Sequence, residues 1–364
     1  MQSETISGLD HLDRLPDELL LAIFARIRDV RTLVGLLSLC RRFRSLVPLS
    51  DSVSLSFPWP QPVVRPHKSR PSFSKNPLGF LLDRILRNPI RRLVSAKSRG
   101  GRANYYDEVG IVGDITERLR VFSEARDVRV ILPCEGGLSE KDGTFLRWRA
   151  SYGSQIRSCI ILGASGVRSI EEELLQEKAA SNGEEGPEEM LAPTSLSDSE
   201  LKLRVVWIIS CLIAASYRHY MMRKVIAACP GLRTMVVGDE RRQGRVVMGE
   251  DEVSDTRRED NECVVQDDDE NTLERSKAPE LRMKLWHAPS LELPKCRRVL
   301  KGATLVVIYP AAGDASCITQ DRHEDSILQR GIEDEDEEED EVFVEAVKEL
   351  RKRNKSYLME MNSF

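Results

Sequence analysis

Residues 12–46 read LDRLPDELLLAIFARIRDVRTLVGLLSLCRRFRSL, and this stretch decides the N-terminal fold. Pro16 lacks a backbone N–H and has a fixed φ, so it suits the first turn of a helix. Asp17 and Glu18 then place negative charge at the positive end of the helix dipole. Apolar residues recur after them at three- and four-residue steps, which predicts an amphipathic helix that begins at this point.

Two further apolar sets follow within the same stretch. One runs over residues 33–39, and the other contains Phe43 and Leu46. The pattern therefore predicts three short helices, which are too small to bury an independent core. Apolar side chains left over after internal packing then need a partner protein that receives the helix in a groove.

This order of motifs resembles the F-box, the short helical module that docks a substrate receptor onto the Skp-family adaptor of a cullin-RING ubiquitin ligase. The resemblance places the module at residues 8–50. It implies adaptor contacts from the Leu-Pro start, the first helix and the Cys-Arg-x-aromatic region. The family more often has Trp where this chain has Phe43, which keeps the aromatic ring but loses the indole N–H. The implied adaptor-binding residues are Leu15, Pro16, Leu19, Ile23, Phe24, Ile27, Leu33, Leu39, Cys40 and Phe43.

The chain has 364 residues, a formal net charge of −5 and few aromatic residues. That length accommodates the N-terminal module, one domain of ordinary size and linkers. The polar start predicts no secretory signal, and no apolar run is long enough to predict a membrane span. Together these features favour a protein of the nucleus or the cytoplasm.

Eight cysteines and five histidines are scattered through the chain without metal-ligand spacing. No Cys-x-x-Cys pair occurs, and without a secretory signal the cysteines are expected to be reduced thiols. The Gly-Gly pairs lack the Lys-Ser/Thr of a phosphate-binding loop, and no Gly-x-Ser-x-Gly marks a nucleophile. We therefore expect no metal, no cofactor and no catalytic residue.

A basic, proline-rich linker is predicted over residues 51–108. Residues 51–102 hold 11 Lys and Arg against 2 acidic residues, and prolines at this density prevent regular structure. Within them, PLGFLLDRILRNPIRRLV at 77–94 is basic and amphipathic, which suits an anionic membrane, a nucleic acid or an acidic partner. The preferred interpretation is a solvated linker with one docking helix. The alternative is a nucleic-acid-associated regulator that uses residues 65–102 as a binding arm.

Three acidic, low-complexity stretches interrupt the rest of the chain. The last of them holds nine consecutive carboxylates at residues 333–341. Like charges at this density repel one another and bury too little apolar surface to offset the entropy of ordering. They predict disordered loops near residues 165–200, 250–278 and 312–341.

The segments between these loops alternate like strands or repeat like helices. They predict an α+β domain over residues 109–364, with a mainly β sheet and one long helix buried on nearly all sides. The expected strands are 127–133, 144–152, 156–163, 232–237, 245–248, 281–286 and 303–309. The expected helices are 114–124, 199–228 and 342–355.

Candidate substrate-binding residues lie at the ends of predicted elements. Arg218, His219 and Tyr220 follow the apolar centre of the long helix, and Trp286 and His287 end a strand. Polar and aromatic side chains at such ends can line a recognition surface. The alternative for both histidines is a hydrogen-bonded position in the core.

Four further segments are similar to plant F-box proteins of the auxin-up-regulated type. They are LRVVWIISCLIAASYRHYMMRKV at 203–225, HAPSL at 287–291, GATLVVIYP at 302–310 and EMNSF at 360–364. The resemblance implies a non-catalytic substrate receptor of a Skp–cullin–F-box ubiquitin ligase, which directs proteins to ubiquitination and degradation in auxin- and cytokinin-linked growth. The implied partners are the Skp-family adaptor, cullin through that adaptor, and a protein substrate.

Overall fold

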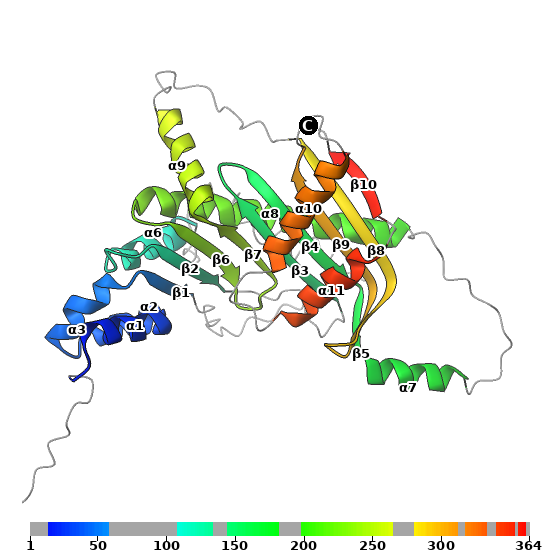
Figure 1. The fold of residues 1–364 in the computed structure, drawn as a ribbon, viewed down its shortest axis with the longest axis horizontal. Coiled ribbons are helices and arrows are strands. Elements are labelled where there is room, and N and C mark those ends of the chain that lie inside the picture. The colour runs from blue at the N-terminus through cyan, green and yellow to red at the C-terminus, as the bar shows by residue number, and fades with distance from the viewer. Residues whose placement is uncertain are drawn as a thin grey trace, which may run out of the picture.

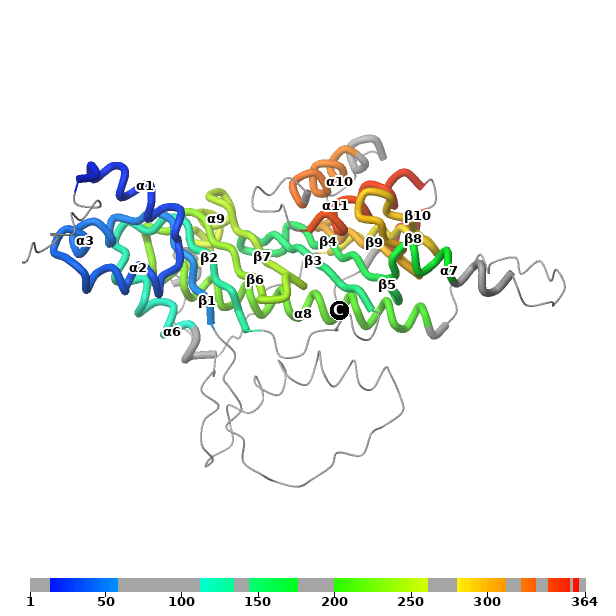
Figure 2. Tube along the Cα trace, turned by 90° about the horizontal axis from the view of Figure 1, so that it is seen from below, coloured from blue at the N-terminus to red at the C-terminus, as the bar shows by residue number. Residues whose placement is uncertain are grey.

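One mixed β-sheet runs through the computed structural model, and helices pack on both of its faces (Figures 1 and 2). Within the described residues ten strands form the sheet, in the order β1-β2-β6-β7-β3-β4-β9-β8-β10, and β5 pairs with β9. The N-terminal helices stand at the β1 end (Figure 1). The structure describes residues 14–57, 108–133, 144–181, 198–264, 280–311, 317–332, 340–353 and 356–361.

The helices and strands have the following bounds. The helices are α1 (Asp17–Ile27), α2 (Val30–Leu36), α3 (Arg41–Leu46), the 3-10 turn η1 (Val47–Leu49), α6 (Glu108–Leu119), α7 (Ile170–Ser181), α8 (Asp198–Ala228), α9 (Glu250–Val264), α10 (Cys317–Ile332) and α11 (Glu341–Arg351). The strands are β1 (Ser52–Ser56), β2 (Asp127–Leu132), β3 (Phe145–Tyr152), β4 (Ile156–Ala164), β5 (Gly166–Ser169), β6 (Thr234–Asp239), β7 (Gly244–Met248), β8 (Leu281–Leu293), β9 (Arg298–Pro310) and β10 (Ser356–Met361).

The sheet changes character along its length. β1, β2 and β6 pair in parallel at the end nearest the N-terminal helices, and β7 pairs in parallel with β3. From β3 the strands continue through β4, β9 and β8 to β10 as antiparallel neighbours. The predicted fold class, N-terminal helices followed by an α+β domain with a mainly β sheet, is confirmed.

The longest helix, α8, lies along one face of the sheet and packs against β3, β4, β6 and β7. It buries Trp207 and Met222, among others. The prediction of a helix buried on nearly all sides is wrong, because Leu201, Val205 and Ile209 are exposed at four-residue steps. A helix in an outer layer buries only the face toward the sheet. No helix in the described part of the chain is both long and apolar enough to cross a bilayer.

Part of the opposite face is covered by α10 and α11, which pack over β4, β8 and β9 (Figure 2). Phe343 and Leu350 of α11 are fully buried there in a second hydrophobic cluster. β4 is buried on both sides: Ile161 faces the core under α8, and Ile160 faces the cluster under α11. On this face β2, β6 and β7 lie beside the two helices rather than beneath them.

The N-terminal helices join the sheet directly through β1. The backbone N–H of Ser54 donates to the carbonyl oxygen of Arg28 at 2.6 Å, and that of Asp127 donates to the carbonyl oxygen of Asp51 at 2.9 Å. One hydrophobic cluster continues from these helices through β1 and α6 to α8. The N-terminal helices and the sheet therefore share a core.

The start of the predicted linker differs from the structure. The prediction of a linker over residues 51–108 is wrong at residues 52–56, which form β1. Buried Val53 and Leu55 alternate there with serines, as in a strand with one face on the core. The basic arm at 65–102 lies outside the described residues.

Parts of the three predicted acidic loops are helical. α7, α9 and α10 fall within residues 165–200, 250–278 and 312–341, so the predicted disorder is wrong for these segments. Arg223 of α8 forms an ion pair with Asp260 of α9. Cations on neighbouring elements reduce the repulsion between carboxylates on which the prediction rested.

The hairpin of β8 and β9 is longer than the strands predicted at 281–286 and 303–309. Its two strands pair from Leu281 and Pro310 to Leu293 and Arg298. Gly302 interrupts the apolar pattern and has a φ of 59°, a conformation that favours glycine. In a sequence, a glycine that interrupts an apolar run reads as the end of a strand, so the predicted strand began at residue 303.

Candidate functional site

The segment before α1 is held in place by Arg42 of α3. Its Nε donates to Oδ1 of Asp17 at 2.8 Å, and its guanidinium also donates to the carbonyl oxygen of Leu15. Asp17 lies in the first turn of α1, where its charge suits the helix dipole. Leu15 and Pro16 are thereby fixed beside the start of α1.

Side-chain caps begin the other two helices. Asp29 accepts hydrogen bonds from N and Oγ1 of Thr32 at 2.9 and 2.6 Å. Burial opposes ionisation of Asp29, but the bonds from Thr32 outweigh it and lower the pKa of Asp29. Sγ of Cys40 accepts from the N–H of Phe43 at 3.4 Å and caps α3. Cys40 therefore has a local structural role in addition to its predicted one.

Three of the predicted adaptor-binding residues lie inside the module. Phe24, Leu33 and Phe43 are buried, and the rings of Phe24 and Phe43 meet edge to face with centroids 5.6 Å apart. Aromatic pairs in this geometry stabilise a core beyond the area they bury. These three side chains hold the helices together, and the prediction of adaptor contact rests on the others.

The other predicted residues lie nearer the surface. Leu19, Ile23 and Leu39 are 51%, 39% and 66% exposed, and Pro16 is exposed with them. Val34 of α2, which the sequence pattern does not single out, is 41% exposed. Several large apolar side chains exposed on one small module make it a candidate docking surface. The apolar docking residues are Leu19, Ile23, Val34 and Leu39. The remaining predicted residues are half-buried: Leu15, Ile27 and Cys40.

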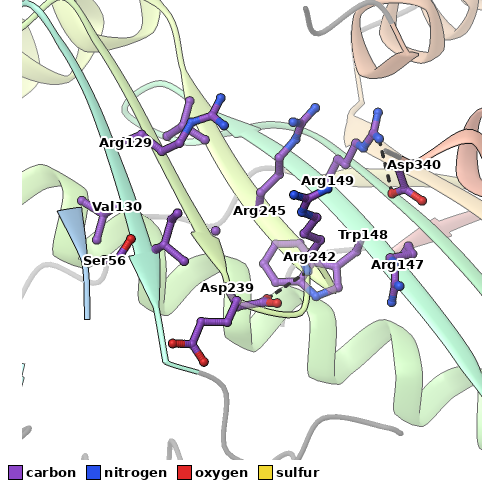
Figure 3. A pocket seen from close by; sticks show the side chains of 15 residues that line it. Ser56, Arg129, Val130, Arg147, Trp148, Arg149, Asp239, Arg242, Arg245 and Asp340 are labelled. Atoms are coloured by element: carbon purple, nitrogen blue, oxygen red, sulfur yellow. Dashed lines mark hydrogen bonds and ion pairs between the residues drawn. The ribbon is translucent and has the colours of Figure 1, made fainter. Parts of the chain in front are cut away.

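A second candidate site, the arginine cavity, lies on the face of the sheet opposite α8 (Figure 3). It has a volume of about 410 Å³ and is lined by residues of β2, β3, β6 and β7. Figure 3 shows Arg129, Arg149 and Arg245 projecting side by side from their strands. Arg147 and Arg242 line the same cavity. Positive charge is thus concentrated at one place in a chain whose net charge is −5.

Arg149 connects this cavity to the helices beside it. Its guanidinium lies 3.5 Å from Oδ2 of Asp340 and 4.1 Å from the ring centroid of Phe343. It also donates to the carbonyl oxygen of Gly331. A carboxylate therefore already lies against an arginine of the cavity, which suits anionic groups chemically.

Residues 12–53 match the model of the F-box-like family, and this span contains the anchored start, the caps and the apolar docking residues. The chain is 32% identical to F-box protein At1g30200 of Arabidopsis thaliana, over 100% of this chain and 96% of that protein. The chain belongs to the F-box protein family. It is also similar to F-box protein At4g18380 of the same plant, at 33% identity over 98% of this chain and 94% of that protein. F-box protein AUF2, again of A. thaliana, is 32% identical over 98% of this chain and 100% of that protein. No solved structure matches the chain significantly.

F-box domains generally bind the Skp-family adaptor within Skp–cullin–F-box complexes, and F-box proteins are generally substrate adaptors rather than catalysts. The described residues contain no group of three or more His, Cys, Asp or Glu side chains placed to hold a metal. Burial raises the pKa of the Cys159 thiol to about 12 and also raises that of Cys211, which leaves both thiols protonated at neutral pH.

The predicted substrate residue Arg218 is packed inside the F-box protein. It donates from Nη2 to Oδ2 of Asp239 at 2.8 Å, and its guanidinium lies 4.7 Å from the ring centroid of Trp148. Gly244 accepts a further hydrogen bond from it and makes room for the ring, because a Cβ there would lie 1.9 Å from Cε2 of Trp148. These contacts assign Arg218 to the structure of the β6–β7 hairpin.

The other four substrate candidates are divided between the two faces of the sheet. Trp286 is buried in the cluster under α11, and Nδ1 of the half-buried His287 lies 3.0 Å from the carbonyl oxygen of Ala303. Among the described residues, no hydrogen bond or ring contact joins Trp286 or His287 to His219 or Tyr220. His219 is buried and Tyr220 is 48% exposed. A role of these candidates in substrate binding stays a prediction.

His219 is a satisfied core histidine. Its Nε2 lies 2.9 Å from the carbonyl oxygen of Gly153, and its ring stacks on Tyr152 with centroids 4.4 Å apart. Burial is the largest cause that lowers the pKa of His219 from 6.5 to about 4, and Arg223 also acts in that direction.

We expect His219 to make stability fall as the pH is lowered from 6.5 to 4. In that window the unfolded chain binds a proton that the folded chain does not, so the free energy of unfolding falls by roughly 2–4 kcal/mol. His219→Gln removes this contribution. The measurement is urea unfolding of the wild type and the variant between pH 7 and 4. If the free energy of unfolding fell equally with pH in both, His219 would not be the buried neutral histidine described here.

Proposed function

We propose that this chain is the substrate receptor of a Skp–cullin–F-box ubiquitin ligase. The observation that carries the proposal is the set of exposed apolar docking residues on a module most of whose other apolar side chains pack inside. Leu, Ile and Val exposed together mark a surface that a partner protein covers. The Skp-family adaptor is the partner that F-box domains generally bind.

In this role the chain acts by proximity. The adaptor and cullin hold the receptor near a conjugating enzyme charged with ubiquitin. The receptor holds a protein substrate beside that enzyme, which raises the effective concentration of the substrate's lysines. The receptor supplies no catalytic group, and the ubiquitinated substrate is degraded by the proteasome.

Leu19→Asp combined with Ile23→Asp is expected to abolish capture of the adaptor. Both side chains are exposed, so the midpoint of thermal unfolding should stay nearly unchanged. The affinity should fall by roughly a hundredfold or more, because a hot-spot side chain contributes about 2 kcal/mol or more. The measurement is calorimetric titration of purified adaptor into the full-length chain. A pull-down of adaptor and cullin with the same variants is the second measurement.

The matched control is Leu175→Asp on α7, where the side chain is 67% exposed at the end of the molecule away from the N-terminal helices (Figure 1). This variant should bind the adaptor like the wild type. Full affinity in the double variant, or equal loss in the control, would rule out the apolar docking residues as the adaptor surface.

The finer part of the proposal is a role in auxin- and cytokinin-linked growth, in the nucleus or the cytoplasm. Its support is the resemblance of residues 203–225, 287–291, 302–310 and 360–364 to plant F-box proteins of the auxin-up-regulated type. The similarity of the chain to F-box proteins AUF1 and AUF2 of A. thaliana agrees with it. Root growth of a plant that lacks this chain, measured with and without each hormone, tests the pathway. An unchanged response to both hormones would contradict it, and a fluorescent fusion tests the location.

A further inference from the structure

The arginine cavity gathers cations from segments far apart in the chain. Arg129 comes from β2, Arg147 and Arg149 from β3, and Arg245 from β7. Arg149 and Arg245 are direct register partners on neighbouring strands. Like charges side by side on one face of a sheet reduce its stability. Cations from three strands meet in one hollow, which makes the hollow a candidate site for an anionic ligand.

The arginine cavity continues into a second hollow. This neighbour has a volume of about 600 Å³ and shares Arg149 and Arg245 with the first. Arg157 of β4 and Arg330 of α10 also line this second hollow. We call the two hollows together the basic groove. They share two arginines, and their combined volume suits a segment of chain better than a single small ion.

The structure shows how this groove takes a carboxylate. Oδ2 of Asp340 lies 3.5 Å from Nη2 of Arg149, at the edge of the cavity (Figure 3). Arg149 is itself almost fully buried, so its guanidinium is held in one position by Phe343 and Gly331. A fixed, desolvated guanidinium binds carboxylate or phosphate with strong, directed hydrogen bonds.

We propose that this basic groove binds an anionic segment of the protein substrate, with Arg129, Arg147 and Arg245 as ligands of its phosphate or carboxylate groups. The inference rests on the proposed receptor function and names the class of substrate that the receptor selects. Arginine recognises both anions by the same forked hydrogen bonds, so a phosphorylated side chain and a run of Asp or Glu share the required chemistry.

Acidic residues around the groove favour a peptide over a nucleic acid. Glu240 and Asp340 line the arginine cavity, and Glu250, Asp251 and Glu252 line the neighbouring hollow. A nucleic acid carries a charge on every phosphate and would meet these carboxylates along its length. A peptide places its charges at chosen side chains and leaves neutral backbone between them.

The test uses fluorescence anisotropy of short labelled peptides with the full-length chain. One peptide carries a phosphoserine between neutral residues, a second carries glutamates, and a third is neutral throughout. Arg129→Gln with Arg245→Gln is expected to weaken binding of the anionic peptides by about tenfold or more, since two charge-assisted contacts are lost. Arg147→Gln alone should weaken it less. Higher salt should weaken it in the wild type.

Arg258→Gln is the control, because this arginine of α9 is 74% exposed and outside both hollows. It should leave peptide binding unchanged. Tighter binding of the phosphopeptide identifies phosphate as the source of charge, and tighter binding of the glutamate peptide identifies carboxylate; both support the proposal. The proposal would be overturned if the neutral peptide bound as tightly as the anionic ones, or if Arg258→Gln weakened binding as much as the double variant. It would also be overturned if a labelled single-stranded oligonucleotide bound more tightly than the peptides and lost that binding in the Arg129→Gln, Arg245→Gln variant.

Adaptor binding and thermal unfolding of the same variants separate this inference from the proposed function. The arginine variants should keep the adaptor affinity of the wild type, because the groove lies outside the N-terminal helices. Normal adaptor binding without peptide binding overturns the groove and leaves the receptor role intact. Peptide binding without adaptor binding contradicts the receptor role and leaves the groove intact.

Discussion

Phe24→Ala is expected to lower the free energy of unfolding by about 3–5 kcal/mol, which is the usual cost of emptying a buried phenylalanine site. Phe24 is only 2% exposed and lies edge to face with Phe43. The same hydrophobic cluster continues to β1 and α8. The loss should therefore appear in the unfolding of the whole body and not only in the N-terminal helices.

Urea unfolding followed by tryptophan fluorescence measures this effect, because Trp148 and Trp207 belong to that cluster. Leu19→Ala is the matched control on the same helix, since its side chain is about half exposed. It should change stability by about 0.5 kcal/mol or less. A loss below about 1 kcal/mol in Phe24→Ala would mean that the helices are packed less tightly than described.

Arg218→Met is expected to cost about 3–5 kcal/mol, because it leaves the carboxylate of Asp239 buried without its cation. The side chains of Arg218 and Asp239 are 11% and 6% exposed. Asp239 also accepts the backbone N–H groups of Gln243 and Gly244 at 2.8 and 3.0 Å, so its position shapes the turn between β6 and β7.

A double-mutant cycle with Asp239→Asn isolates this pair. Asn keeps the acceptor for the turn but removes the charge, so the double variant should be more stable than the sum of the two losses predicts. Arg118→Met is the control, because Arg118 pairs with Asp114 at 3.0 Å on an exposed surface. That loss should stay near 0.5 kcal/mol. Additive losses at Arg218 and Asp239 would contradict a direct interaction.

Local patterns predicted the elements whose causes are local. Pro16, Asp17 and the apolar steps after them place the start of α1 correctly, because the helix dipole and amphipathicity act within a few residues. Alternation likewise predicted β2, β3 and β4 to within a residue or two. The sequence pattern did not predict the helix α9. One of its carboxylates, Asp260, pairs with Arg223 of α8, which a local pattern does not reveal.

The arginine cavity could not be predicted from local sequence patterns. Alternation places Arg147 and Arg149 on one face of a strand, but nothing in the sequence shows that β7 lies beside that strand. The strand order brings Arg245 and Arg129 to the same face only after folding. Among the ten predicted adaptor-binding residues, the pattern could not separate the buried Phe24 from the exposed Leu39, because both are apolar residues at helical spacing.

The shared core beneath the N-terminal helices has a mechanical consequence. Because β1 enters the sheet straight after those helices, the N-terminal helices and the strands that carry the arginine cavity belong to one continuously packed unit. Bending between them would break buried apolar contacts and the ladder between β1 and β2. If the chain is the receptor proposed above, it would hold its substrate at a fixed distance from the adaptor. Which lysine of a substrate receives ubiquitin would then depend on the length of substrate chain between the anchored segment and that lysine.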